Sequence, residues 1–262
     1  MSVVFRVQNL HQNYGGVQAL QGVDFELMAG ECVALIGPNG AGKSTCFACV
    51  AGQQVAKQGR IVWRQHVLNA LGPQARRALG VARTFQVAQV FEALSAIQNL
   101  QLVLKASSSI SMLDVLADCE IDGAWHWVHK MGLENLGQEA LNAPAMALSY
   151  GAKKRLELAL AMAGLPDAPN GLLLLDEPAA GLSQAERTDM MLRVKAVTKE
   201  GTTVLYTEHN MDAVFGVADR VLVLMEGRLV AQGLPQDVAV HPLVRERYLG
   251  SEFQYGGEVR HA

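Results

Sequence analysis

The chain has 262 residues, of which 50% are hydrophobic and 18% are charged, and its formal net charge is −3. A chain of this length and composition can bury a substantial core as one or two domains. The weak negative charge provides no general electrostatic footprint for DNA, RNA or an anionic membrane, so nucleic acid is not expected among the partners. We find neither a secretory signal peptide nor an uninterrupted run of roughly 18 apolar residues, and therefore expect a cytoplasmic protein.

The first part of the chain alternates strand-like stretches with glycine-containing breaks, which is typical of a strand-rich region. Strands are predicted at residues 3–7, 23–27, 32–36 and 60–63. The third of them is an apolar run, and it leads directly into a glycine-rich loop.

That loop, residues 37–44, matches the pattern Gly, any four residues, Gly-Lys-Ser/Thr. Glycines allow backbone N–H groups to turn towards phosphate oxygens, and the helix predicted at residues 44–50 adds the partial positive charge of its N-terminus. Lys43 is expected to reach the β- and γ-phosphates of a nucleotide, and the Ser44 hydroxyl to bind Mg²⁺. The expected nucleotide contacts are Gly37, Pro38, Asn39, Gly40, Ala41, Gly42, Lys43, Ser44 and Thr45.

The rest of the chain has a helical middle followed by alternating strands and helices. Helices are predicted at residues 97–105, 112–119, 123–131 and 153–162. After residue 169, strands at 172–175, 203–206 and 221–225 alternate with helices at 184–200 and 211–218. Apolar strands joined by helices predict a mostly parallel sheet that is covered on both faces.

These elements predict one α/β domain over residues 1–250. Its core comprises residues 1–86 and 165–250, and residues 87–164 form an inserted α-helical subdomain. Residues 251–262 form a polar tail.

Two carboxylates follow the predicted strand 172–175. Ligands of open α/β sheets bind at the carboxyl ends of the strands, which is where Asp176 and Glu177 are expected to lie. Asp176 is expected to hold Mg²⁺ directly or through water. Glu177 is expected to orient and polarise a water molecule that attacks the γ-phosphate.

The order of the motifs along the chain resembles that of the nucleotide-binding subunit of an ABC transporter, whose core is a P-loop NTPase fold with additional antiparallel strands. The resemblance extends from Leu10 to Gly250. It rests on the phosphate loop, Arg83-Thr84-Phe85-Gln86, Leu148-Ser149-Tyr150-Gly151 at the start of a helix, Asp176-Glu177-Pro178 after a strand, and Thr207-Glu208-His209.

The resemblance implies a role for several side chains. Tyr14 matches the aromatic residue that stacks on adenine, which implies ATP as the nucleotide. Gln86 matches the glutamine that reaches Mg²⁺ and the attacking water, and His209 matches the histidine that binds the γ-phosphate and positions the catalytic glutamate. Ser149 and Gly151 match residues that contact ATP bound to a second subunit, so hydrolysis is expected to require a homodimer or heterodimer of ATPase subunits.

Several of these segments are most similar to the ATPases of branched-chain amino acid importers. Membership of that group implies two transmembrane permease subunits and a periplasmic solute-binding protein as partners. The chain would then lie on the inner face of the plasma membrane, attached through the permeases. Ala152 and Ser183 replace a common glutamine and aspartate, which leaves communication between the two sites open.

The solute also remains open, because the partners select it. Branched-chain or other hydrophobic amino acids are expected, with urea, amides and aromatic acids as alternatives. A soluble ABC ATPase acting on DNA or ribosomes is the rival class. It fits less well, because the sequence has neither long coiled-coil heptads nor a basic excess.

Overall fold

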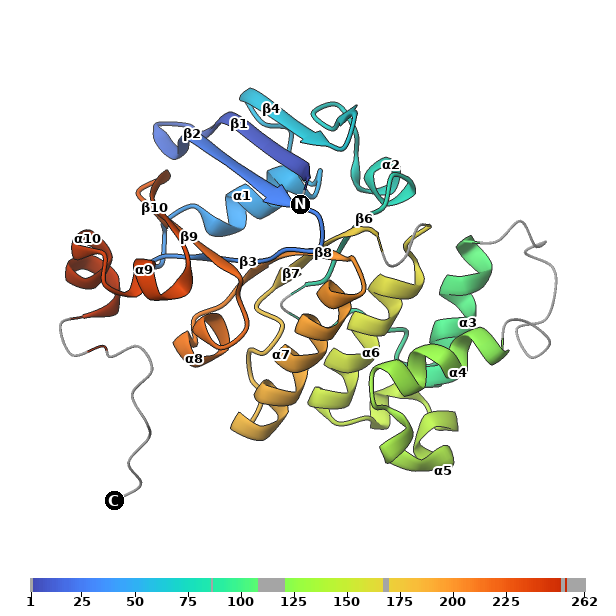
Figure 1. Cartoon of the computed structure of the whole chain (residues 1–262). Coiled ribbons are helices and arrows are strands. Elements are labelled where there is room, and N and C mark those ends of the chain that lie inside the picture. Colours follow the sequence, from blue (N-terminus) through green and yellow to red (C-terminus); the bar gives the residue numbers. More distant parts are fainter. Residues whose placement is uncertain (1, 86, 108–120, 167–169, 251–252, 254–262) are drawn as a thin grey trace, which may run out of the picture.

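The computed structural model describes residues 2–85, 87–107, 121–166, 170–250 and 253. Two sheets lie one above the other with helix α1 (Lys43–Val50) between them, and most other helices cover the far face of the larger sheet (Figure 1). This arrangement confirms the predicted α/β core with antiparallel strands and an additional helical region. The predicted helix at 112–119 and nearly all of the predicted tail lie outside the described residues.

The smaller sheet is antiparallel and has the strand order β2-β1-β4-β5. Its first two strands are longer than predicted, because they form a hairpin whose turn is Gly15-Gly16, with Gly15 in the left-handed region at φ +56°. The strands are β1 (Val3–Tyr14), β2 (Val17–Met28), β4 (Gln58–Trp63) and β5 (His66–Val67).

The larger sheet has the order β10-β9-β3-β8-β7-β6, and all of its strands are parallel except the edge strand β10. Parallel pairing brings the carboxyl ends of its strands to the same edge of the sheet. The strands are β3 (Cys32–Ile36), β6 (Val81–Arg83), β7 (Leu172–Asp176), β8 (Thr203–Thr207), β9 (Arg220–Met225) and β10 (Arg228–Gly233).

Alternate residues of the parallel strands supply two separate cores. In β3, Val33 and Leu35 pack with α1 and the antiparallel sheet, whereas Ala34 and Ile36 pack with the helices on the opposite face. Every residue of this strand is fully buried. Burial on both faces explains why the strand is a continuous apolar run without polar alternation.

The remaining helices include the predicted ones at 97–105, 123–131, 153–162 and 184–200. The helix predicted at 211–218 is shorter, because it ends before Gly216. They are α2 (Pro73–Ala78), α3 (Ala96–Ser107), α4 (Ile121–Lys130), α5 (Gly137–Asn142), α6 (Tyr150–Ala163), α7 (Gln184–Lys199), α8 (Met211–Phe215), α9 (Pro235–Ala239) and α10 (Pro242–Val244). Within the described ranges, no helix combines the length and apolar character needed to span a membrane.

A buried guanidinium joins α1 to α2. Arg76 is 1% exposed, and burial lowers the pKa of its side chain to about 10. It donates to the carbonyl oxygens of Leu71 at 2.8 Å, Cys49 at 2.7 Å and Leu68 at 2.7 Å, and also to that of Val50. Cys49 and Val50 are at the end of α1, where helix carbonyls have no intrahelical partner and a cation is favoured.

We expect Arg76→Met to lower the free energy of unfolding by about 2 to 4 kcal/mol, because it leaves several buried carbonyl groups without donors. Urea denaturation would measure the change. The exposed Arg60 of β4 provides a control, and Arg60→Met should alter stability by less than about 0.5 kcal/mol. Equal stabilities of the two variants would show that the Arg76 hydrogen bonds do not hold α1 and α2 together.

Candidate active site

At two positions of the loop after β3, the backbone conformation and the close neighbours leave room only for glycine. Gly37 has φ +147°, and a Cβ atom there would lie 2.0 Å from the Leu224 carbonyl oxygen. Gly42 has φ +101°, and its Cβ would lie 2.4 Å from the Ala19 carbonyl oxygen. These glycines are therefore required by the packing of the loop against β2 and β9, in addition to the approach of a ligand.

Lys43 crosses this loop from the first turn of α1. Its side chain is buried, and its Nζ donates to the carbonyl oxygens of Gly37 at 2.6 Å and Pro38 at 3.0 Å. Burial lowers the pKa of Lys43, and the nearby charges of Glu177 and Asp176 oppose that effect. The start of α1 thus combines a cation with helix amides that Gly42, having no side chain, cannot cap.

Other predicted nucleotide contacts lie around this helix start. Ser44 is exposed and Thr45 is half-buried. Asn39 and Gly40 are exposed at the tip of the loop, whereas Ala41 is buried. Ser44 and the loop tip at Asn39 and Gly40 are therefore accessible to a ligand.

The two carboxylates are anchored to the neighbouring strand β8. The Thr207 hydroxyl donates to Asp176 Oδ1 at 2.8 Å, and the Glu177 backbone N–H donates to the same hydroxyl at 3.1 Å. Glu177 has a left-handed backbone with φ +47°, which is uncommon for a residue with a side chain. This conformation turns the chain directly after β7, beside the position where β8 ends.

The Glu177 carboxylate lies beside His209. Its Oε1 is 2.9 Å from His209 Nε2, and the histidine side chain is 43% exposed. These two residues were expected to act together, and the fold brings them into contact from the ends of two different strands. The contact places a carboxylate and an imidazole at the same sheet edge as the loop that carries Lys43.

Glu208, for which the sequence motifs predicted no role, connects this pair to the loop that follows Glu177. Glu208 is 3% exposed, and its carboxylate accepts the backbone N–H groups of Ala179 at 2.9 Å and His209 at 3.2 Å. Burial raises its pKa, whereas these hydrogen bonds act in the opposite direction. In the sequence, the role of Glu208 was indicated only by the position of its carboxylate, next to His209 at the end of a buried strand.

Arg83 is a second residue whose position was not foreseen. Its Nη2 donates to Asp176 Oδ2 at 2.7 Å, and its guanidinium lies 5.3 Å from the centre of the Phe85 ring. The Asp176 carboxylate therefore faces a guanidinium on one side and the Thr207 hydroxyl on the other. Within the described residues, the Arg83 Nε is buried without a hydrogen-bond partner.

The oxygen atoms of Ser44 and Asp176 are suitable ligands for Mg²⁺, although they do not surround the metal position completely. Ser44 and Asp176 supply hard oxygen atoms, which Mg²⁺ prefers. Among the residues that the structure describes, no cluster of three or more His, Cys, Asp or Glu side chains forms a metal site. A site with few protein ligands fits a metal that is bound together with substrate phosphates and water.

Ser149 precedes α6 as its N-cap, and Gly151 lies in the first turn of the helix, against the start of α7. The Ser149 hydroxyl accepts the Ala152 backbone N–H at 3.2 Å and caps the helix. A Cβ at Gly151 would lie 2.5 Å from Glu186 Oε1. Glu186 in turn forms a capping box with Ser183, which explains a serine at that position.

The remaining predicted residues are Tyr14 and Gln86. Tyr14 ends β1, is 45% exposed and donates its hydroxyl to Gln54 Oε1, so its ring is accessible for stacking. Gln86 lies outside the described residues.

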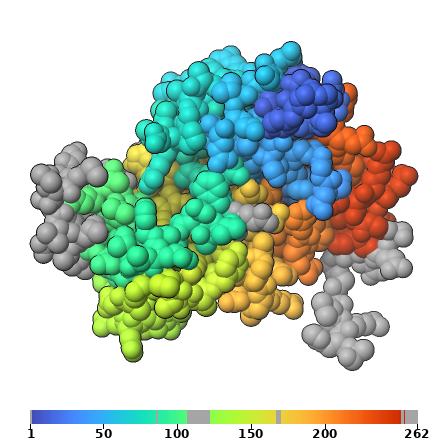
Figure 2. Space-filling view, turned by 180° about the vertical axis from the view of Figure 1, so that it is seen from behind, coloured from blue at the N-terminus to red at the C-terminus, as the bar shows by residue number. Residues whose placement is uncertain are grey.

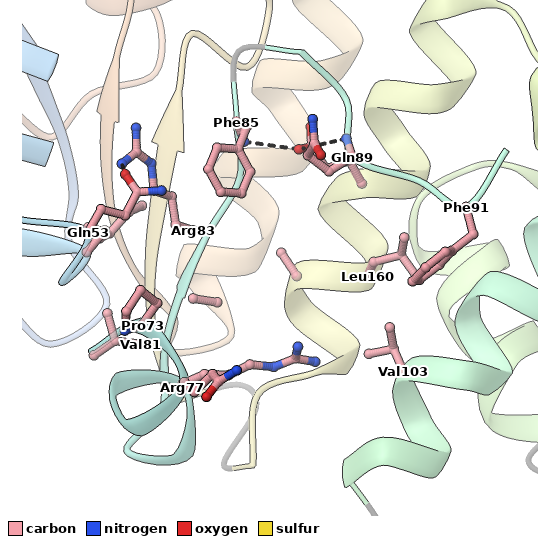
Figure 3. Close-up of a pocket in the computed structure, with 16 residues that line it drawn as sticks. Gln53, Pro73, Arg77, Val81, Arg83, Phe85, Gln89, Phe91, Val103 and Leu160 are labelled. Atoms are coloured by element: carbon pink, nitrogen blue, oxygen red, sulfur yellow. Dashed lines mark hydrogen bonds between the residues drawn. The ribbon is translucent and has the colours of Figure 1, made fainter. Parts of the chain in front are cut away.

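A groove of about 340 Å³ runs beside Arg83 and Phe85, between the α2 region and the helical region (Figure 3). Its lining includes Phe91, Val103 and Leu160. Figure 2 shows the cyan α2 region and the green helices on this side of the molecule, adjacent to one another. Arg83, whose side chain contacts Asp176, is also part of the groove lining.

Comparison with known proteins agrees with this geometry. The family model described as ABC transporter matches residues 20–180. The chain is 35% identical over 254 residues to the high-affinity branched-chain amino acid transport ATP-binding protein LivG of Salmonella typhimurium and to that of Escherichia coli, covering 93% of this chain and 96% of each relative. It is 32% identical to BraF of Pseudomonas aeruginosa, covering 94% of this chain and 98% of BraF.

Solved structures with the same fold include a nucleotide-free ATP-binding cassette from an ABC transporter, with a TM-score of 0.80, 25% identity, and coverage of 95% of this chain and 100% of the other. A cassette in its ADP conformation has a TM-score of 0.80, 26% identity and the same coverage. The sequence match and the arrangement of loop, carboxylates and histidine lead to one conclusion: the chain belongs to the ABC transporter family, as an ATP-binding and ATP-hydrolysing cassette.

Proposed function

We propose that this chain powers the import of branched-chain or other hydrophobic amino acids, or of related small organic solutes. The observation that carries the catalytic part is the 2.9 Å contact between Glu177 and His209 at the sheet edge where the phosphate loop also lies. LivG and BraF, which this chain matches over nearly their whole length, are branched-chain amino acid transport proteins, and this supports amino acids as the transported solutes. Urea, amides and aromatic acids are the alternative solutes.

In this proposal the residues at the sheet edge divide the reaction between them. Lys43 and the loop amides bind the phosphates of ATP, and Tyr14 stacks on the adenine. Ser44, Asp176 and Gln86 hold Mg²⁺, which neutralises phosphate charge when it is bound.

Glu177 accepts a proton from the attacking water, and His209 orients that carboxylate and contacts the γ-phosphate. In this structure the two side chains already touch, so their relative orientation does not have to be created when ATP binds. The site is then completed by Ser149 and Gly151 of a second ATPase subunit, identical to this one or different from it.

The proposed assembly has this domain, residues 1–250, at the cytoplasmic face of the plasma membrane beneath two permease subunits. A periplasmic solute-binding protein delivers the solute to them. ATP favours closure of the ATPase dimer because it contacts both subunits, and hydrolysis removes those shared contacts. The helical subdomain, proposed as residues 87–164, lies beside the groove next to Phe85, where a permease would receive the motion.

We expect Glu177→Gln to reduce ATP turnover by about 100-fold or more, because the amide cannot accept the proton of the attacking water. ATP binding should persist, so that an ATP-bound dimer accumulates in size-exclusion chromatography with Mg²⁺ and ATP. The exposed Glu246 provides the control Glu246→Gln, for which turnover should remain unchanged. Normal turnover in Glu177→Gln would disprove the assignment of the general base.

We expect Lys43→Ala to weaken ATP binding by about tenfold or more, because a charge-assisted contact with the phosphates is lost. Titration with a fluorescent ATP analogue would measure the dissociation constant. Lys199→Ala, at the exposed end of α7, should bind the analogue as the wild-type protein does. If both variants bind alike, Lys43 is not a phosphate ligand.

We expect affinity purification of the tagged chain from its native cells, in mild detergent, to recover integral permease subunits. Calorimetry on the associated solute-binding protein would then identify the solute among amino acids, urea, amides and aromatic acids. Recovery of only nucleic acid or ribosomes would instead favour a soluble ABC ATPase outside transport.

A further inference from the structure

Helix α6 contains an ion pair whose two members are almost completely buried. Lys154 is 2% exposed and Glu157 is 5% exposed, and Lys154 Nζ lies 3.6 Å from Glu157 Oε2. Burial lowers the pKa of the lysine and raises that of the glutamate. Buried charges are unfavourable unless hydrogen bonds compensate them, so their remaining partners are informative.

Those partners belong to the backbone of the segment that follows β6. Glu157 Oε1 accepts the N–H of Phe85 at 3.0 Å and the N–H of Gln89 at 3.3 Å, which are the dashed contacts in Figure 3. Lys154 Nζ donates to the Phe85 carbonyl oxygen at 2.8 Å. One helix thus holds the backbone of Phe85 through two oppositely charged side chains, and that of Gln89 through Glu157.

An apolar pair of similar size could fill the same space in α6 without the cost of burying charge. It would leave the N–H groups of Phe85 and Gln89 and the carbonyl group of Phe85 without these partners. The chemistry of the pair therefore matches the attachment of this segment better than it matches the filling of a core.

The two ends of this connection lie at functional positions. Ser149 caps α6 and Gly151 lies in its first turn, and a continuous helix joins them to the buried pair. Two residues before Phe85, the side chain of Arg83 forms the 2.7 Å ion pair with Asp176. Described contacts thus connect the start of α6 to a carboxylate of the nucleotide site.

We propose that Lys154 and Glu157 are positioning residues that fix the backbone of Phe85 and Gln89 to α6, so that these two residues follow the helix when Ser149 and Gly151 engage nucleotide on a second subunit. This inference rests on the proposed function of the Ser149 and Gly151 segment. It adds the specific side chains that transmit a movement of α6 to the groove beside Phe85 and towards Asp176.

Hydrogen–deuterium exchange tests the attachment directly, at the amides that Glu157 holds. In Glu157→Leu, which preserves much of the side-chain volume, exchange at Phe85 and Gln89 should accelerate by about tenfold or more. Glu157→Gln retains an acceptor oxygen and should give an intermediate rate. Lys153→Met is the matched control, because Lys153 precedes Lys154 and forms a more exposed ion pair with Glu92.

Transmission is tested with Mg²⁺ and ATP in the Glu177→Gln background, where the nucleotide persists. With the pair intact, ATP should slow exchange at residues 149–155 and also at Phe85 and Gln89. With Glu157→Leu added, residues 149–155 should still respond whereas Phe85 and Gln89 should not. An unchanged response of the two amides in Glu157→Leu, or no response of them in its parent, would overturn the proposal.

Steady-state kinetics separates positioning from loss of binding. In the otherwise wild-type protein, Glu157→Leu and Lys154→Met should lower kcat by about tenfold, with KM for ATP within about twofold of wild type. Lys153→Met should retain both constants, and thermal unfolding would show that all variants are folded. Wild-type kcat in folded Glu157→Leu would reject the inference, whereas a wild-type protein that fails to hydrolyse ATP would reject the proposed function itself.

Discussion

The register of three parallel strands is the constraint on which the site depends. In β8, Thr207 pairs with Leu35 of β3 on one side and with Asp176 of β7 on the other. The residues one or two places after these positions are therefore neighbours, although they come from distant parts of the sequence. They include Gly37, Glu177 and His209, and a shift of one residue in either pairing would turn the side chains of a strand to the opposite core.

Electrostatic balance around this edge determines which charged side chains can be buried. Lys43 is held by carbonyl oxygens of its own loop and lies near two carboxylates, and Glu208 is held by backbone N–H groups. Burial disfavours the charged form of both side chains, because it lowers the pKa of Lys43 and raises the pKa of Glu208. Hydrogen bonds with the backbone stabilise the charged form of each side chain, and they also restrict the positions of the loops that take part in them.

The same principle extends away from the nucleotide loop. Charged side chains on helices hold backbone groups that lack regular partners in two places, where Arg76 binds carbonyl groups at the end of α1 and before α2, and where Lys154 and Glu157 bind Phe85 and Gln89. Irregular segments have few partners of their own for buried backbone groups, so a neighbouring helix must provide them. Attachment of this kind fixes a segment to a particular helix, whereas apolar packing alone is not directional.

The sequence by itself determined the α/β fold, the family and the location of the phosphate loop, because those depend on local patterns of apolar runs, glycines and motif order. It also predicted the strand β7 that carries Asp176 and the start of a helix at the Ser149 motif. Only the tertiary structure decided that Arg83 faces Asp176, that Glu208 binds the backbone of Ala179, and that Glu157 holds Phe85 and Gln89. These contacts join residues that are far apart in the chain, and side-chain partners across such distances follow from how strands and helices pack, which no local pattern contains.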